Sequence, residues 1–220
     1  MTEAASIRGT CDGARGDTRA DAVRRFEQAA QRWVSSRSAG ATPDATTHAA
    51  ATTAVLVEGT SDRAALLALA ELHQRDLAAE GVAVLPMGGA MSIRRFVGLL
   101  GPSGFGMRLR GMCDAHEVGF FERAGMPADG YQVCEPDLEG EFIRALGLPR
   151  IEAVLAAQGD LRLFRTFQQQ PAQRPRSTEK QLHRFFGTTS GRKEHYAREL
   201  VLAAGVERVP APLNRLLDSL

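Results

Sequence analysis

Residues 54–62 read AVLVEGTSD, an apolar run that ends in glutamate and glycine and is followed by an aspartate four positions after the glutamate. The run of residues 54–57 has the length and composition of a buried strand. After Asp62, leucine and alanine recur at helical spacing as far as Ala79. A buried strand that leads through a polar turn into a helix is the repeating unit of parallel α/β sheets. This stretch therefore predicts a parallel sheet with carboxylates at the end of its first strand.

Similar strand–helix pairs continue the pattern through residue 146. We expect strands at Val82–Leu85, Met107–Cys113 and Tyr131–Cys134, and helices at Ile93–Leu100, Val118–Ala124 and Asp137–Leu146. Beyond Pro149 we expect helices only, near residues 150–157, 178–186, 192–204 and 211–219. The predicted fold class is α/β, with a mainly parallel four-stranded, Rossmann-like sheet that is flanked by helices and followed by a helical C-terminal extension.

The first 53 residues differ in composition from this body. Residues 1–17 are polar and lack apolar periodicity, so we expect them to be disordered. Residues 20–34 place apolar side chains on one helical face, which predicts an amphipathic helix that docks on the body or on a partner. Residues 38–53 have the composition of a linker. The predicted organisation is an N-terminal appendage (1–53), one main domain (54–205) and a C-terminal helix (206–220).

Composition narrows the class of protein. A chain of 220 residues is long enough for one well-buried domain with appendages. No apolar run reaches the length that spans a bilayer, and the first residues lack the apolar core of a signal peptide, so we expect no membrane partner. The three cysteines include no Cys-x-x-Cys pair, which argues against a zinc cluster or a disulfide framework and favours a cytoplasmic location.

The net charge of +1 conceals an uneven distribution along the chain. Residues 54–159 hold 9 Arg against 14 Asp and Glu, whereas residues 160–200 hold 9 Arg and Lys against 4 Asp and Glu. An acidic body beside a basic flank suits a site that gathers metal ions and then receives a polyanion. Charges that merely solvate helices would give the same pattern, so the distribution alone does not decide between the two.

Carboxylates follow three of the four predicted strands. They are Glu58 and Asp62 after the first strand, Asp114 at the end of the third, and Asp137 and Glu139 after the fourth. The carboxyl ends of parallel strands meet at one edge of the sheet, so these side chains are expected to converge. Crowded carboxylates repel one another unless a cation lies among them, and oxygen-only surroundings suit Mg²⁺ or Mn²⁺.

Each of these acids also has a structural explanation. Asp62 can stabilise the start of its helix, and Asp137 and Glu139 occupy first-turn positions where acids favour any helix. Asp114 is different, because an aspartate that ends a buried strand is costly without a partner. The combination of acids, rather than any one of them, favours a metal site.

Four further positions are candidates for the same site. Lys193 is one of only 2 Lys against 25 Arg, and it falls in a predicted first helical turn, where the helix dipole disfavours a cation. It is a candidate to bind phosphate, with a solvated surface lysine as the alternative. Arg184 and Arg192 are candidate contacts to a nucleic-acid backbone. His116 either supports the metal ligands or is an ordinary residue at a helix start.

Together these motifs resemble a TOPRIM domain, the fold shared by topoisomerases, primases and several nucleases. The features that carry the resemblance are Glu-Gly after the first strand, the acid four positions later, the glycine pair after the second strand and Asp114 at the end of the third. Asp137-Leu-Glu139 and Gly191-Arg-Lys193 are similar, more closely, to the TOPRIM half of OLD-family (overcoming lysogenization defect) ATP-dependent endonucleases. The resemblance covers about residues 54–205 and marks them as a TOPRIM-like catalytic domain.

The resemblance implies a metal-dependent endonuclease that uses two Mg²⁺ or Mn²⁺ ions. By this similarity Glu58 and Asp62 would hold one ion, Asp114 would share it, Asp137 with Glu139 would hold the second, and Lys193 would face the scissile phosphate. Glu58, Asp114 and Lys193 would then be the catalytic residues. Two ions held by shared carboxylates can neutralise a phosphodiester and activate water without a reactive side chain.

Two features depart from the family pattern. The third strand of TOPRIM proteins usually carries Asp-x-Asp, but here His116 replaces the second acid. OLD proteins also place an ATPase before this domain, whereas this chain has no G-x-x-x-x-G-K-[ST] motif, so any ATP dependence would require a separate ATPase partner.

The expected activity is a nuclease acting on nucleic acid, with DNA favoured over RNA and a homodimer left open. The alternatives are a non-catalytic TOPRIM-like subunit that binds metal or nucleic acid, and a phosphohydrolase that acts on a small molecule.

Overall fold

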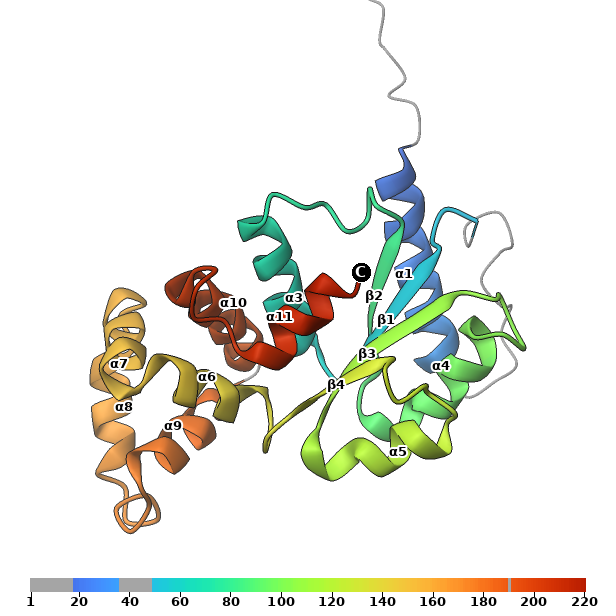
Figure 1. Cartoon of the computed structure of the whole chain (residues 1–220). Coiled ribbons are helices and arrows are strands. Elements are labelled where there is room, and N and C mark those ends of the chain that lie inside the picture. Colours follow the sequence, from blue (N-terminus) through green and yellow to red (C-terminus); the bar gives the residue numbers. More distant parts are fainter. Residues whose placement is uncertain (1–17, 36–48, 190) are drawn as a thin grey trace, which may run out of the picture.

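The computed structural model describes residues 18–35, 49–189 and 191–220, and at its centre lies a sheet of four parallel strands (Figure 1). The strands are β1 (Thr53–Val57), β2 (Val82–Pro86), β3 (Arg108–Asp114) and β4 (Tyr131–Cys134), in the spatial order β2-β1-β3-β4. The expected α/β fold class and the expected strands are confirmed. The segment expected to be disordered (1–17) and most of the expected linker (38–48) lie outside the described residues.

Helices account for most of the other described residues. They are α1 (Arg19–Ser35), α3 (Thr60–Leu72), α4 (Ile93–Leu100), α5 (Val118–Arg123), α6 (Leu138–Leu146), α7 (Leu148–Ala157), α8 (Leu161–Gln168), α9 (Thr178–Phe186), α10 (Arg192–Ala204) and α11 (Ala211–Asp218), with 3-10 turns η1 (Ala90–Ser92) and η2 (Ala115–Glu117). In the described part of the chain, no helix is long and apolar enough to cross a membrane.

Two helices differ from the sequence prediction. α3 ends at Leu72 rather than near Ala79, because Gln74 adopts a φ of 57°, which takes the backbone out of the helix. α8 is not predicted at all. Its eight residues bury only Phe164 and Phe167, which is too short a pattern to identify a helix from periodicity.

Helices cover both faces of the sheet, which explains why the strand sequences are apolar without a break (Figure 1). Val55 and Val57 of β1 belong to a core that includes residues of α3, α10 and α11. Ala54 and Leu56 belong to a second core with residues of α1, α4 and α5. Successive strand residues point to opposite faces, so both cores draw on the same short strand.

Beyond β4, helices α6 to α9 form a lobe that stands to one side of the sheet (Figure 1). Aromatic rings stabilise it, since Phe185 packs edge-on against Phe164 and Phe167 at centroid distances of 5.2 and 5.6 Å. α10 then returns and packs along α3, and α11 packs on β3 and β4. The return of α10 brings its first turn to the carboxyl edge of the sheet. The division of the chain at residues 53 and 205 stays a prediction.

The N-terminal helix α1 packs against β2, the edge strand of the sheet. Val23 and Phe26 on its inner face are fully buried. Glu27, which is 7% exposed, accepts a hydrogen bond at Oε1 from the backbone N–H of Val84 (2.7 Å) and pairs at Oε2 with Arg63 (2.9 Å). α1 therefore satisfies a backbone donor of the edge strand that no neighbouring strand can reach.

Replacing Glu27 with alanine is expected to lower the free energy of unfolding by about 2–4 kcal/mol, because the Val84 N–H and the Arg63 guanidinium both lose a buried partner. Urea denaturation followed by circular dichroism measures the loss. Gln28→Ala, on the exposed side of the same helix, is the control and should change the stability by less than about 0.5 kcal/mol. Equal stability of the two variants would contradict the described contact between α1 and the sheet edge.

Candidate metal centre

Three of the acids predicted from the strand ends lie together at the carboxyl edge of the sheet. Glu58 directly follows β1, Asp62 occupies the first turn of α3, and Asp114 is the last residue of β3. The backbone N–H of Asp114 donates to Oε1 of Glu58 at 3.1 Å, which ties the two strand ends together. A cavity of about 450 Å³ opens beside them, and Lys193 also lines it. The structure thus brings these four predicted residues to one place, while their chemical roles stay predictions.

Burial and mutual repulsion raise the pKa values of two of these acids. Asp62 is 9% exposed, and its burial raises its pKa to about 7 although Oδ2 accepts a hydrogen bond from the Gly59 N–H (2.9 Å). That hydrogen bond is the helix-start role that the sequence left open for Asp62. Burial, followed by the charges of Glu58 and Asp62, raises the pKa of Asp114 to about 8. A cation in the cavity would replace these protons.

A fourth acid, Glu117, joins this group and is not among the predicted residues. It ends the 3-10 turn η2 and interacts with the Glu58 carboxyl. That contact, together with burial, raises the pKa of Glu117 to about 7. The neighbouring His116, where the family pattern places an acid, has a side chain that is 74% exposed. No signal in the sequence identifies Glu117, because a turn of three residues is too short to give a periodic pattern.

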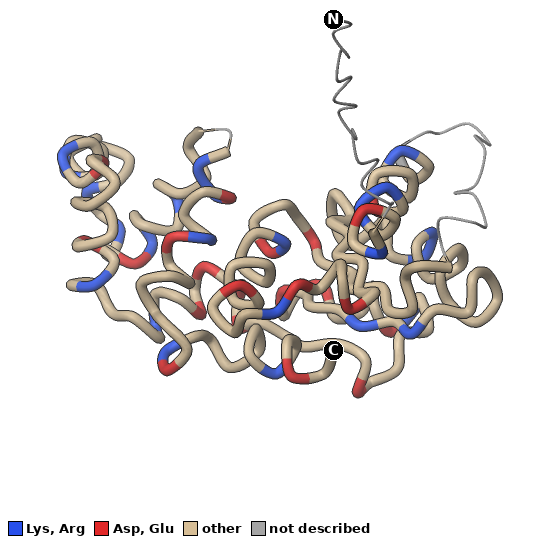
Figure 2. Tube along the Cα trace, turned by 90° about the horizontal axis from the view of Figure 1, so that it is seen from above, with Lys and Arg blue, Asp and Glu red and all other residues tan. Residues whose placement is uncertain are grey.

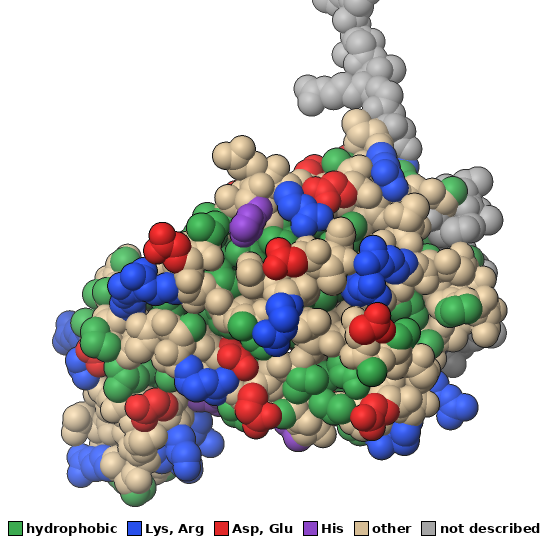
Figure 3. Space-filling model, viewed as in Figure 1, with side chains coloured by type: hydrophobic (Ala, Val, Ile, Leu, Met, Phe, Trp, Pro, Cys, Tyr) green, Lys and Arg blue, Asp and Glu red, His purple; other side chains and the backbone are tan. Residues whose placement is uncertain are grey.

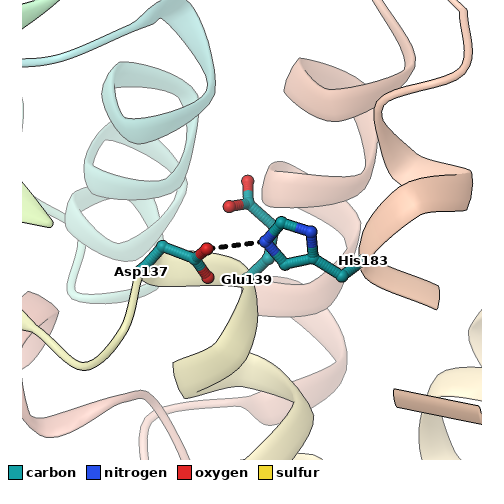
Figure 4. Close-up of side chains that lie close together, drawn as sticks. All are labelled: Asp137, Glu139 and His183. Carbon is teal, nitrogen blue, oxygen red and sulfur yellow. Dashed lines mark hydrogen bonds and ion pairs between the residues drawn. The ribbon is translucent and has the colours of Figure 1, made fainter. Parts of the chain in front are cut away.

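The two acids predicted for a second ion form a separate group with a histidine (Figure 4). Single ligand atoms of Asp137, Glu139 and His183 all lie within 4.8 Å of one another. Oδ1 of Asp137 accepts a hydrogen bond from the Gly140 N–H (2.8 Å), and Oδ2 lies 2.6 Å from Nε2 of His183. Asp137 therefore caps α6, which is the structural alternative that the sequence left open for it. His183 is not predicted, because only the fold brings α9 to the start of α6.

The contact between Asp137 and His183 stabilises their charged forms. The hydrogen bond to Asp137 raises the pKa of His183. Burial alone would raise the pKa of Asp137, but the hydrogen bond from His183 brings it below its ordinary value. A cation that binds Asp137 and Glu139 would compete with the proton that His183 shares with Asp137. It would either displace that proton or bind Nε2 of the neutral His183 ring as a further ligand.

Lys193 lies between the two groups of acids. Its Nζ is 3.1 Å from Oε1 of Glu139, and its side chain is half exposed. Burial alone would lower the pKa of Lys193, but the Glu139 carboxylate raises it, so the ammonium keeps its charge at neutral pH. The side chain lines both the 450 Å³ cavity and a neighbouring cavity of about 440 Å³ that Glu139 and His183 also line. This position differs from that of a lysine surrounded by solvent.

The two predicted arginines have different surroundings. Arg184 is exposed and lines the 440 Å³ cavity beside His183. Arg192 lies over the ring of Phe185, 4.5 Å from its centroid, and donates from a terminal nitrogen to Thr188 at 2.6 Å. The structure therefore places Arg184 next to the candidate site and uses Arg192 to fasten the start of α10. Contact of either residue with nucleic acid stays a prediction.

The glycine pair after β2 forms one wall of the 450 Å³ cavity. Gly88 and Gly89 have φ values of 70° and 110°, which other residues rarely adopt. Their N–H groups donate to the backbone oxygen of Glu58 at 3.0 and 3.2 Å, so the pair holds a tight turn against the end of β1. No atom lies within 4 Å of where either Cβ would be, so a ligand can also approach this backbone closely.

Basic residues lie next to the acidic centre of the molecule. Many acidic positions lie through the middle of the molecule, with some basic positions among them and further basic positions on both sides (Figure 2). In the space-filling view the lobe of α7 to α9 carries several Lys and Arg side chains (Figure 3). A cavity of about 370 Å³ beside α9 is lined in part by Arg144, Arg176, Lys180 and Arg184. A cationic surface therefore lies next to the acidic centre.

Comparison with known proteins supports the fold. Residues 51–115 match the sequence model of the overcoming lysogenization defect protein-like TOPRIM domain. The fold is similar to the C-terminal region of the Burkholderia pseudomallei OLD protein (TM-score 0.57, 19% identity, 77% of this chain and 96% of that chain). It is also similar to the C-terminal region of the Xanthomonas campestris pv. campestris OLD protein (TM-score 0.56, 23% identity, 76% of this chain and 93% of that chain). No curated protein matches the chain. The predicted resemblance is confirmed, and at these identities the solved structures show the fold alone.

Metal-free protein is expected to lose stability as the pH rises. The native state keeps protons on Asp62 and Asp114 up to pKa values of about 7 and about 8, whereas unfolded aspartates release theirs near pH 4. Because the native state then binds more protons than the unfolded state, the free energy of unfolding falls between about pH 5 and 8 and levels off above that window. Urea denaturation in EDTA at a series of pH values measures the slope.

Asp114→Asn removes one titrating group and should flatten this slope, whereas Glu207→Gln, at an exposed position, should leave it unchanged. His183 adds a slope of the same sign, because its raised pKa also favours a protonated native state. The comparison between the two variants therefore isolates Asp114. Equal slopes in the two variants would contradict the described environment of Asp114.

Proposed function

We propose that this chain, which carries an OLD-like TOPRIM domain, is a divalent-metal-dependent nuclease that hydrolyses phosphodiester bonds in nucleic acid, with DNA favoured over RNA. The observation that carries the proposal is the meeting of Glu58, Asp62 and Asp114 with Lys193 in one cavity. Acids that repel one another beside a charged lysine form a site for a cation and a phosphate together. The family match over residues 51–115 supports the same reading.

The residues present fit a hard divalent cation. The donors in the 450 Å³ cavity are carboxylate oxygens, which Mg²⁺ and Mn²⁺ prefer. Asp62 is buried, and its carboxyl accepts a hydrogen bond from the Gly59 N–H and lies in the same cavity as the charged Lys193, which leaves room for a cation to bind it. In this proposal Glu58 and Asp62 hold one ion, Asp114 shares it, and Asp137 with Glu139 holds the second. The bound ions supply positive charge to the phosphate and activate water.

The side chains of the chain itself would position the substrate. Lys193, held by Glu139 at 3.1 Å, keeps its ammonium between the two groups of acids, where it can bind a non-bridging oxygen of the scissile phosphate. The positive φ values of Gly88 and Gly89 leave open space against which a phosphate can lie. Glu58 and Asp114, linked by a hydrogen bond at 3.1 Å, keep a fixed separation of the two strand ends. Preorganised groups of this kind favour the transition state without rearranging.

The basic side chains beside α9 would bind the phosphate backbone away from the cleavage point. Arg184 lines both the 370 Å³ and the 440 Å³ cavity next to α9, and Arg144 and Arg176 line the 370 Å³ cavity. Contacts of this type carry affinity rather than sequence preference, and they weaken with salt. Arg192 would support this surface through Phe185. A separate ATPase subunit belongs to the proposal as a partner, because the family resemblance is to OLD proteins, which combine this domain with an ATPase. A homodimer also belongs to the proposal.

One observation favours a second candidate function. Both oxygens of Asp137 already contact protein groups, the Gly140 N–H and the His183 ring. If His183 keeps that place, only one ion binds, and the chain is a TOPRIM-like subunit that binds metal or nucleic acid without cleaving it. Calorimetry with Mn²⁺ separates the two functions, since it counts the ions that bind.

The nuclease proposal predicts that the protein nicks supercoiled plasmid with Mn²⁺ or Mg²⁺ and that EDTA stops the reaction. Glu58→Gln and Asp114→Asn should abolish nicking, because each removes a shared ligand, while the fold measured by circular dichroism survives. Lys193→Ala should slow nicking by about 10²–10³-fold, the usual effect of losing one group that stabilises the transition-state charge.

Arg198→Ala is the matched control for the lysine, because it removes an exposed cation from the same helix and should leave nicking unchanged. Glu207→Gln serves as the control for the acids. Plasmid that stays supercoiled at high protein concentration with Mn²⁺, with candidate ATPases present as well as absent, would overturn the nuclease proposal.

A further inference from the structure

A histidine from the helical lobe meets the two acids that follow β4 (Figure 4). His183 lies on α9, whereas Asp137 and Glu139 lie at the start of α6. One carboxylate oxygen of each acid and a ring nitrogen of His183 all lie within 4.8 Å of one another. Ligands about 2.1 Å from a shared divalent ion lie about 3–4 Å apart. Small side-chain rotations are therefore enough to bring the three atoms to a common ion.

Glu139 is the most buried of the three, with a side chain that is 9% exposed. Its Oε1 lies 3.1 Å from Nζ of Lys193, and no other described residue donates a hydrogen bond to this carboxylate. In the proposed function Lys193 binds the scissile phosphate, which takes the ammonium away from Glu139. A buried carboxylate without a partner is costly, so a cation has to replace the ammonium there.

The contact between His183 and Asp137 is not needed to cap α6. Oδ1 of Asp137 already accepts the Gly140 N–H at 2.8 Å, while Nε2 of His183 lies 2.6 Å from the other oxygen, Oδ2. An ion can therefore bind Nε2 and Oδ2 without removing the helix cap.

Open space adjoins these ligand atoms. Glu139 and His183 line the 440 Å³ cavity together with Lys193, which also lines the 450 Å³ cavity of the first group of acids. An ion at this place has room for water or a phosphate oxygen in its remaining coordination positions.

We propose that His183 is a ligand of the second divalent ion, together with Asp137 and Glu139, and that its nitrogen makes this site select Mn²⁺ over Mg²⁺. Mg²⁺ prefers oxygen ligands, whereas an imidazole nitrogen suits transition-metal ions. The inference rests on the proposed metal-dependent function. The family resemblance implies only the two acids, and the histidine comes from this chain. In the second candidate function, by contrast, His183 excludes the ion.

The test compares His183→Gln with two controls, His116→Ala and His73→Ala, in the full chain. Both control histidines are exposed; His116 lies beside the first group of acids, and His73 follows the last residue of α3. Pulsed electron paramagnetic resonance of the Mn²⁺-loaded protein detects a nitrogen nucleus bound to manganese, which a purely structural histidine does not give. The wild type and both controls should show the nitrogen coupling, and His183→Gln should lose it. The glutamine amide can still donate to Asp137, so the circular dichroism spectrum should not change.

Calorimetry measures the selectivity of the same variants. His183→Gln should weaken binding of the second Mn²⁺ on the order of tenfold or more and weaken Mg²⁺ binding much less. His183→Ala, which offers neither a donor nor a ligand atom, should also lose the coupling. Equal weakening of the two metals would overturn the claimed selectivity.

The outcomes separate this inference from the proposed function. Wild-type protein that binds two Mn²⁺ ions without nitrogen coupling, or coupling that persists in His183→Gln, would show that the inference is wrong while the proposed function stands. Wild-type protein that binds one ion and still nicks plasmid would have the same meaning. Wild-type protein that binds no Mn²⁺ would overturn the proposed function itself.

Discussion

Carboxylates held against one another at the carboxyl edge of the sheet are the constraint on which the rest of the structure depends. Glu58 accepts a hydrogen bond from the Asp114 N–H, and the buried Asp62 lines the same cavity as both of them. Such a set is unfavourable in a poorly solvated place unless protons or a cation neutralise it. The fold therefore maintains an arrangement that lowers its own stability in the absence of a cation. That cost is characteristic of binding sites and not of packed cores.

The topology explains how these acids are kept together. β1 and β3 are parallel neighbours, so Glu58 and Asp114 emerge at the same edge, and their hydrogen bond fixes the register of the two ends. Cores on both faces make the strands rigid. The lobe of α6 to α9 lengthens the path of the chain, and α10 then returns along α3 to place Lys193 beside the acids. A charged lysine and the carboxylates thus come from elements far apart in the sequence.

The sequence predicts the sheet well, because strands buried on both faces are apolar without a break, and it predicts the strand-end acids, because chain order determines the edge at which they lie. It does not predict Glu117, since the family pattern directs attention to position 116 and the tight turn after β3 has no sequence signature. His183 is missed because its partner Asp137 is 46 residues away. Arg184 and Arg192 look equivalent in sequence, and only the packing of Arg192 on Phe185 separates them.

Anomalous X-ray diffraction from crystals of the full chain grown with Mn²⁺ tests the central claim most directly. We expect a manganese peak in the cavity at the ends of β1 and β3, with oxygens of Glu58 and Asp114 among its ligands. Crystals saturated with Mn²⁺ that show no peak there, with Glu58 still bound to the Asp114 N–H, would contradict the account.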